Sequence, residues 1–246
     1  MNSDPRLTVV ADYAALSRAA ADRVAAEVAQ HPNGAITVPT GGTPIGMYQE
    51  LVDRVHRGAL NLSRIHIYCL DEYLGVSAED PNSLTGWLER VFLAPAGIPA
   101  AHVHAVPAAA SDPKTAAHDY EAELSARGGL DLAVLGLGPN GHIAYNEPGS
   151  AAGSRTRVLD LTPESVAQAA GYWQESVPIP NQAMTLGVGT ILEARRIALL
   201  VSGEEKAEML RRALRDPMSP AVPASWLRLG AERLEVIADE GAASKL

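Results

Sequence analysis

The stretch LDLAVLGLG, residues 130 to 138, is an almost continuous apolar run that breaks into glycines at its end. Such a run predicts a strand that is buried on both faces, as the strands of a parallel sheet are. On either side of it, short apolar segments alternate with segments of helical spacing. We therefore predict an α/β fold with a doubly wound, mainly parallel sheet and helices on both faces, which is a Rossmann-like architecture.

The alternation divides the chain into expected elements and loops. Ligands bind at the carboxyl ends of strands in such sheets, so the loops after Pro39, Leu70, Gly136 and Ser202 are the expected functional loops. Helices are expected at 13–30, 43–58, 80–93, 113–129, 163–171 and 204–216, and strands at 35–39, 64–70, 130–138, 156–161, 183–188, 196–203 and 233–240.

Composition narrows the class of protein. The 246 residues suit one large domain spanning 1–246, with 47% hydrophobic and 20% charged residues. A net charge of -9 repels nucleic acid, and no apolar window is long enough to cross a membrane, so we expect neither partner. The single cysteine, Cys69, excludes an internal disulfide and a cysteine-based zinc cluster, and it suggests the cytoplasm.

The loop PTGGTPIGMY, residues 39–48, has the features of an anion site. Gly41 and Gly42 let backbone amides approach an anion, the following helix adds its dipole, and Thr40 and Thr43 add hydroxyl groups. The spacing is neither that of a P-loop nor that of a dinucleotide fingerprint. A tight turn into a helix is the alternative.

Two further strand ends carry charged side chains. Asp71 and Glu72 follow the strand at 64–70, where a partly desolvated carboxylate would make a general base. Helix capping or surface charge is the alternative for this pair. Lys206 lies in the first turn of an expected helix, where a cation opposes the dipole, so anion binding or simple solvent exposure explains it.

The loop after Gly136 holds His142 among glycines. A histidine passes protons near neutral pH when a neighbour holds its ring, and Asn140 and Glu147 are the candidates. A structural histidine is the alternative. The six other histidines lie in turns, on helices or on strand faces without such neighbours, and we assign them no role: His31, His56, His66, His102, His104 and His118. No zinc motif is present, so we expect no metal.

Several long motifs in order resemble the glucosamine-6-phosphate deaminase (isomerase) family, which is related to the 6-phosphogluconolactonases. They are PTGGTPIGMY, LDEYLG, GLGPNGHIAYNEPGS, SRTRV, AMTLGVGTIL, SGEEKA and PASWLRL, and they span the chain from about residue 8 onward. The lactonases usually show DGHTASLFP where this chain has NGHIAYNEP. The resemblance therefore favours the deaminase branch, which acts in amino sugar metabolism and N-acetylglucosamine degradation.

The resemblance implies an enzyme, a hydrolase and isomerase, that converts glucosamine 6-phosphate and water to fructose 6-phosphate and ammonia without a cofactor. It implies that Asp71 moves the C2 proton to C1 and that His142, aligned by Glu147 and Asn140, opens the sugar ring. Phosphate would be held by Thr40, Gly41, Gly42, Thr43 and Lys206. Ile143 and Tyr145 would be packing residues, and a mobile lid would span roughly 155–182.

One departure from the family concerns the phosphate. The family usually has arginine at position 171, where this chain has Gly171, and Arg155 or Arg157 is a candidate replacement. The substrate could therefore be a different amino sugar. A 6-phosphogluconolactonase-type hydrolase and a non-catalytic sugar-phosphate sensor are further alternatives. The resemblance to smaller members implies a monomer or small homo-oligomer.

Overall fold

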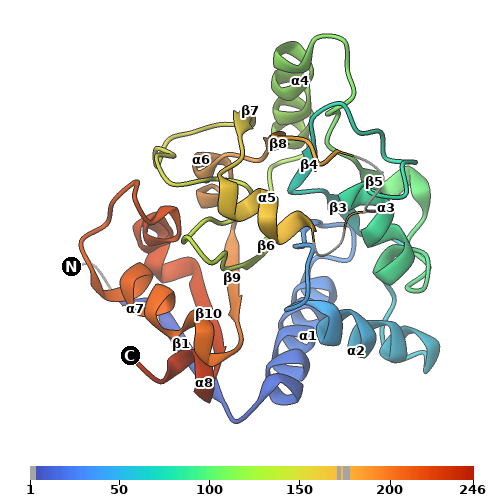
Figure 1. The fold of residues 1–246 in the computed structure, drawn as a ribbon. Coiled ribbons are helices and arrows are strands. Elements are labelled where there is room, and N and C mark those ends of the chain that lie inside the picture. Colours follow the sequence, from blue (N-terminus) through green and yellow to red (C-terminus); the bar gives the residue numbers. More distant parts are fainter. Residues whose placement is uncertain (1–3, 171–172, 174–177) are drawn as a thin grey trace.

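The computed structural model describes residues 4–170, 173 and 178–246, and these contain a seven-stranded and a three-stranded sheet (Figure 1). All pairs in the large sheet are parallel, in the order β1-β10-β9-β6-β2-β3-β5. Its strands are β1 (Arg6–Val10), β2 (Ala35–Thr37), β3 (His66–Tyr68), β5 (Val103–His104), β6 (Leu132–Gly136), β9 (Arg196–Val201) and β10 (Leu234–Asp239). The predicted doubly wound α/β class is confirmed.

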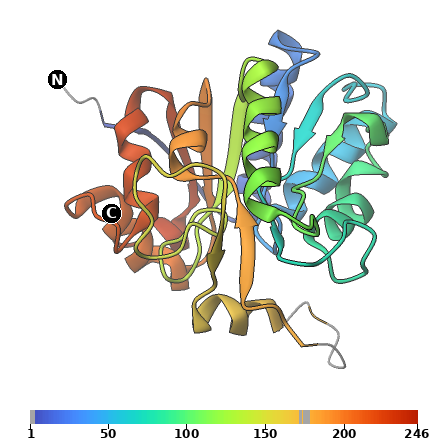
Figure 2. The same ribbon diagram turned by 90° about the horizontal axis from the view of Figure 1, so that it is seen from above.

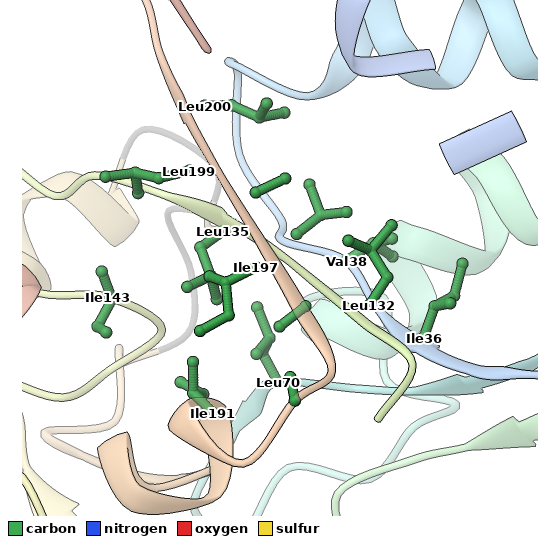
Figure 3. Close-up of a cluster of buried hydrophobic side chains, with 14 of the residues drawn as sticks. Ile36, Val38, Leu70, Leu132, Leu135, Ile143, Ile191, Ile197, Leu199 and Leu200 are labelled. Carbon is green, nitrogen blue, oxygen red and sulfur yellow. The ribbon is translucent and has the colours of Figure 1, made fainter. Parts of the chain in front are cut away.

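Strand β6 lies in the middle of this sheet because its side chains are apolar on both faces. It pairs with β2 on one side and with β9 on the other. Leu132 is buried beside Ile36 of β2, and Leu135 is buried beside Ile197 and Leu199 of β9 (Figure 3). Full burial of such a side chain contributes about 1.5 to 3 kcal/mol, so this run strongly favours the central position.

Helices cover the sheet, and the first shows how the chain specifies them. Asp12 accepts a hydrogen bond from the Ala15 amide and so caps the predicted 13–30 helix at its observed start. In Figure 1 that helix lies beside the next one, and α4 lies at the opposite end of the view. The helices are α1 (Tyr13–Gln30), α2 (Ile45–His56), α3 (Leu84–Leu88), α4 (Pro113–Ala126), α5 (Pro163–Ala170), α6 (Val188–Leu192), α7 (Ala207–Arg215) and α8 (Glu240–Ala243).

Shorter helical turns complete the chain. A π-helical turn, η1 (Glu89–Leu93), continues α3, and the 3-10 helices are η2 (Ala100–His102), η3 (Glu204–Lys206) and η4 (Pro223–Arg233). Among the described residues, no helix is long and apolar enough to span a membrane.

The small sheet corrects two expectations. It is antiparallel, in the order β4-β8-β7, with β4 (Asp71–Tyr73), β7 (Arg157–Asp160) and β8 (Gln182–Thr185). The strands expected at 156–161 and 183–188 therefore exist but do not join the parallel sheet, and residues 71–73 form a strand rather than a loop. Figure 2 shows α5 at the outer end of β7 and β8.

The order of strands creates a crevice at one edge of the large sheet. From β2 the chain continues outward to β3 and β5, and it then returns to place β6 on the other side of β2. Loops that leave β2 and β6 diverge at this switch point, which is where ligands bind in open α/β sheets.

Candidate active site

A cavity of about 370 Å³ lies at this switch point. Part of its wall is built from the segments after β2, β3, β6 and β9, which are the four segments expected from the sequence. Among the predicted site residues, those that line it are Thr40, Gly41, Gly42, Thr43, Asp71, His142 and Lys206. Asn140 and Glu147 lie behind His142 and do not line the cavity.

Asp71 begins strand β4 and faces the cavity with only 8% of its surface exposed. Burial, followed by the neighbouring charge of Glu72, raises the pKa of Asp71 from 3.8 to about 7. A carboxylate with such a pKa accepts protons readily at neutral pH, which is the property of a general base.

Glu72 points the other way and has a structural function. Its carboxylate accepts hydrogen bonds from the backbone amides of Tyr73, Leu84 and Thr85. Burial raises the pKa of Glu72, and these amide bonds oppose that rise. Glu72 therefore connects the start of α3 to β4, which matches the capping alternative for this residue. Of the two neighbouring carboxylates, Asp71 is the one that faces the cavity.

Two glycines allow His142 to reach the cavity. Gly141 has φ of 87°, a left-handed conformation that side chains disfavour. Gly138 lies against the imidazole, and a β-carbon there would overlap the Nε2 atom of His142. The Gly138 amide also donates to the His142 carbonyl at 2.9 Å, which closes the loop. The apolar run therefore breaks into glycines because the ring folds back onto the chain.

Glu147 lies on the inner side of the imidazole. Its Oε2 is 3.6 Å from Nδ1 of His142. Burial alone would raise the pKa of Glu147, but the neighbouring imidazole of His142, the Ser165 hydroxyl and the Asn140 amide lower it to about 2. Glu147 is therefore ionised at neutral pH, and its charge favours a proton on Nδ1.

Asn140 acts differently from the sequence expectation. Its Nδ2 donates to Glu147 Oε2 at 2.8 Å and to Thr162 Oγ1 at 3.1 Å, and its Oδ1 accepts from the His142 backbone amide at 3.2 Å. Asn140 thus holds Glu147 and the histidine backbone, whereas the expected bond to the ring is not among its contacts with described residues.

Several residues that line the cavity were not predicted from the sequence, and one of them, Tyr145, was expected to be a packing residue. Gln168 and Ala169 of α5, together with Trp173, line the cavity. Tyr145, expected only to pack, lines it too and donates to the Tyr73 hydroxyl at 2.8 Å. Ile143 is fully buried in the core as expected (Figure 3). Helix α5 lies within the lid of residues 155–182 that the resemblance implies, but nothing in the spacing of the sequence indicates that it reaches this cavity.

The other end of the cavity offers groups for an anion. The Tyr13 hydroxyl donates to the Gly42 carbonyl at 3.2 Å and accepts from the Gly46 amide at 2.9 Å, so the glycine loop is anchored to α1. Burial lowers the pKa of Lys206. Within the described part of the chain no ion pair to Lys206 is found, so its ammonium group is available to a ligand.

The expected arginine substitutes do not line the cavity. Arg155 pairs with Glu121 at 2.6 Å and with Glu193. Arg157 donates to Asn146 at 2.9 Å and to Ser150 at 2.8 Å. Gly171, whose lack of a side chain motivated the search for a substitute, lies outside the described residues. Arg90, which donates to the Pro81 carbonyl at 2.9 Å, does line the cavity.

Three of the histidines that were assigned no role lie close together. Nδ1 of His66 is 3.0 Å from Nε2 of His104, whose Nδ1 is 2.6 Å from Glu123. The ring centroids of His66 and His102 are 4.3 Å apart. The expectation of isolated histidines was therefore wrong, because β3 and β5 pair side by side. Among the described residues, no group of three or more His, Cys, Asp or Glu is arranged to hold a metal ion.

Comparison with known proteins agrees with this geometry. Residues 10–236 match the family described as glucosamine-6-phosphate isomerases/6-phosphogluconolactonase. A protein named glucosamine-6-phosphate deaminase from Rhodopirellula baltica is 37% identical over 98% of this chain and 95% of its own length. A solved structure of a monomeric glucosamine-6-phosphate deaminase, described as a missing link of the NagB superfamily, superposes with a TM-score of 0.94 at 34% identity, covering 98% of this chain and 100% of that one.

A 6-phosphogluconolactonase from Trypanosoma brucei superposes less closely. Its TM-score is 0.76 at 25% identity, over 99% of both chains. The matched residues extend over nearly the whole chain, from β1 to β10. The chain therefore belongs to the family of glucosamine-6-phosphate isomerases and 6-phosphogluconolactonases.

Proposed function

We propose that this chain is a glucosamine-6-phosphate deaminase, which converts glucosamine 6-phosphate and water to fructose 6-phosphate and ammonia. One observation carries the proposal: Asp71 and His142 border the same cavity, whose other end combines the Thr40–Thr43 loop with Lys206. A buried base, a ring that transfers protons and an anion site are the groups that this reaction needs. The deaminase names of the relatives support the same activity.

The first step of the proposed mechanism opens the sugar ring. Glu147 favours a proton on Nδ1 of His142, which leaves Nε2 to accept a proton from the hydroxyl at C1 and to pass one to the ring oxygen. The bond between C1 and the ring oxygen breaks, and an aldehyde forms at C1. This transfer needs one positioned imidazole and no net change in charge.

The second step moves a proton from C2 to C1. The aldehyde at C1 and the ammonium at C2 acidify the C2 proton, which the Asp71 carboxylate removes to give an enolamine. Asp71 then returns the proton to C1, which produces a ketimine at C2. Water adds to C2, ammonia leaves, and fructose 6-phosphate remains. The pKa of Asp71, about 7, suits both the removal and the return of the proton.

The phosphate group would lie at the end of the cavity formed by Thr40, Gly41, Gly42, Thr43 and Lys206. Backbone amides at the start of α2 favour an anion, and Lys206 supplies a positive charge. Among the described residues, the other cation that lines the cavity is Arg90. The chain would use these groups in place of an arginine at position 171.

An ammonia assay on the purified protein tests the proposal. Glucosamine 6-phosphate should release ammonia and yield fructose 6-phosphate, whereas 6-phosphogluconolactone should not be hydrolysed faster than in buffer. Turnover of the lactone without ammonia release would favour the lactonase alternative. Equal turnover of glucosamine with and without phosphate would discard the anion site and favour a different amino sugar.

A variant pair tests the base. Asp71→Asn keeps the shape of the side chain, so binding of the sugar phosphate should persist while turnover falls by at least roughly a hundred-fold. Glu79→Gln removes an exposed carboxylate from the loop that follows β4 and serves as the matched control. Full activity of Asp71→Asn would refute the assignment.

The remaining proposals concern the whole molecule. The single domain 1–246 would close over the substrate with a lid at roughly 155–182, because α5 contributes Gln168 and Ala169 to the cavity. Residues 171–172 and 174–177 of this range lie outside the described residues. The relative with the closely similar fold is described as monomeric, which supports a monomer here. Cys69 is the one cysteine and is buried, which fits the cytoplasm.

A further inference from the structure

Ser165 of α5 is buried directly behind the imidazole of His142. Its side chain is 1% exposed, and its Oγ is 3.2 Å from Nδ1 of His142. The nearest Glu147 oxygen is 3.6 Å from the same nitrogen, which is beyond normal hydrogen-bond length. The hydroxyl of Ser165 is therefore the closer partner of the ring nitrogen.

The groups around Ser165 and His142 favour one direction for this contact. Nδ2 of Asn140 donates to Thr162 Oγ1 at 3.1 Å, and the Thr162 hydroxyl donates to Ser165 Oγ at 3.3 Å. The Ser165 oxygen is thus an acceptor for Thr162. Glu147 is ionised at neutral pH, because its neighbours His142, Ser165 and Asn140 lower its pKa to about 2 against the effect of burial.

The charge of Glu147 decides the role of the ring nitrogen. Its Oε2 is 3.6 Å from Nδ1 and favours a proton there, and the Ser165 oxygen at 3.2 Å then accepts the hydrogen bond from Nδ1. In this arrangement Nδ1 carries the proton, and Nε2 keeps its lone pair. An imidazole in this tautomer presents an acceptor to a sugar hydroxyl.

We propose that Ser165 is a positioning residue that holds the proton on Nδ1 of His142 and links the orientation of the imidazole to helix α5. The catalytic part of this inference rests on the proposed deaminase function. The link to α5 follows from the position of Ser165, because the same short helix brings Gln168 and Ala169 to the cavity wall. A ligand that shifts α5 therefore also shifts the partner of the catalytic ring.

The test compares Ser165→Ala with Ser165→Thr, which keeps the hydroxyl, and with Glu164→Ala, an exposed change on the same helix. Imidazole ¹⁵N chemical shifts of the free protein report which ring nitrogen carries the proton. Wild type, Ser165→Thr and Glu164→Ala should show the proton on Nδ1, whereas Ser165→Ala should show a mixture of tautomers.

Kinetics provide the second readout. In Ser165→Ala, kcat for ammonia release should fall roughly ten-fold with little change in KM, because part of the advantage of a positioned acid-base group is lost. Ser165→Thr should stay within about three-fold of wild type. If Ser165→Ala does not fold, Thr162→Val replaces it, because loss of the Thr162 donor frees the Ser165 hydroxyl to rotate and should mix the tautomers in the same way.

Specific results would overturn the inference. Unchanged ¹⁵N shifts in Ser165→Ala, or in Thr162→Val where that variant is used, would show that the hydroxyl does not hold the proton. Equal losses of kcat in Ser165→Ala and Glu164→Ala would indicate a general effect on the helix. A protein that releases no ammonia but shows the tautomer change would defeat the proposed function and leave the link between Ser165 and the imidazole intact.

Discussion

Replacing Asp71 by asparagine is expected to stabilise the folded protein at alkaline pH while it removes the proposed base. In the fold, Asp71 keeps its proton up to about pH 7, whereas an ordinary aspartate loses it near 3.8. The folded state therefore binds more protons than the unfolded state between these values. Because of this difference, the free energy of unfolding of the wild type falls as pH rises through that window.

The size of the effect follows from the two pKa values. At pH 5 only about one folded molecule in a hundred has Asp71 ionised, while nearly every unfolded chain has lost the proton. At pH 8 both states are ionised. The free energy of unfolding should therefore decrease by roughly 2.6 kcal/mol between pH 5 and pH 8 through this one group. Asparagine does not titrate, so Asp71→Asn lacks this decrease.

Urea unfolding of both proteins at pH 5, 6, 7 and 8 measures the difference. The stability of Asp71→Asn minus that of wild type should grow steadily with pH, and taking this difference cancels the titration of the groups that do not interact with Asp71. Asp53→Asn makes the same chemical change at an exposed position of α2 and serves as the control. A growth of less than about 1 kcal/mol over this range would refute the argument that burial holds the proton on Asp71.

Three further outcomes are expected. In Gly138→Ala the new methyl group displaces the ring of His142, so kcat for ammonia release should fall at least roughly ten-fold; normal turnover in a folded variant would contradict the packing. Lys206→Met should raise KM for the phosphorylated sugar roughly ten-fold, and an equal effect on the unphosphorylated sugar would argue against a phosphate contact. Burial lowers the pKa of His66 to about 4, so its neutral form stabilises the fold above about pH 6.5 and this contribution is lost as pH falls toward 4. Thermal melts from pH 7 to 5 should therefore show a smaller decrease for His66→Gln than for wild type, and identical decreases would contradict this.

The sequence correctly predicted the helices and strands whose ends are set by neighbouring residues in the chain. The helix at 13–30 has the expected ends because Asp12 caps it and its apolar residues recur at helical spacing. The buried run at 130–138 predicted the central strand. The strand ends predicted the cavity wall, because a parallel sheet brings successive carboxyl ends to one edge.

Long-range pairing decided the rest. The segments at 156–161 and 183–188 alternate like other strands, and nothing local shows that they pair with each other and with β4. The meeting of His66 and His104 likewise depends on the pairing of β3 with β5. Ser165 is 23 positions from His142 in the sequence, so only the position of α5 reveals their contact.

The small sheet also has a consequence for engineering this family. Strand β4 carries Asp71, and its hydrogen-bonded neighbour β8 is the segment by which the chain returns from α5. A graft that transplants residues 157–185 from another member would therefore replace the strand that pairs with the Asp71 segment, together with the α5 residues that line the cavity. Chimeras built in this region should exchange residues 71–73 together with the transplanted segment.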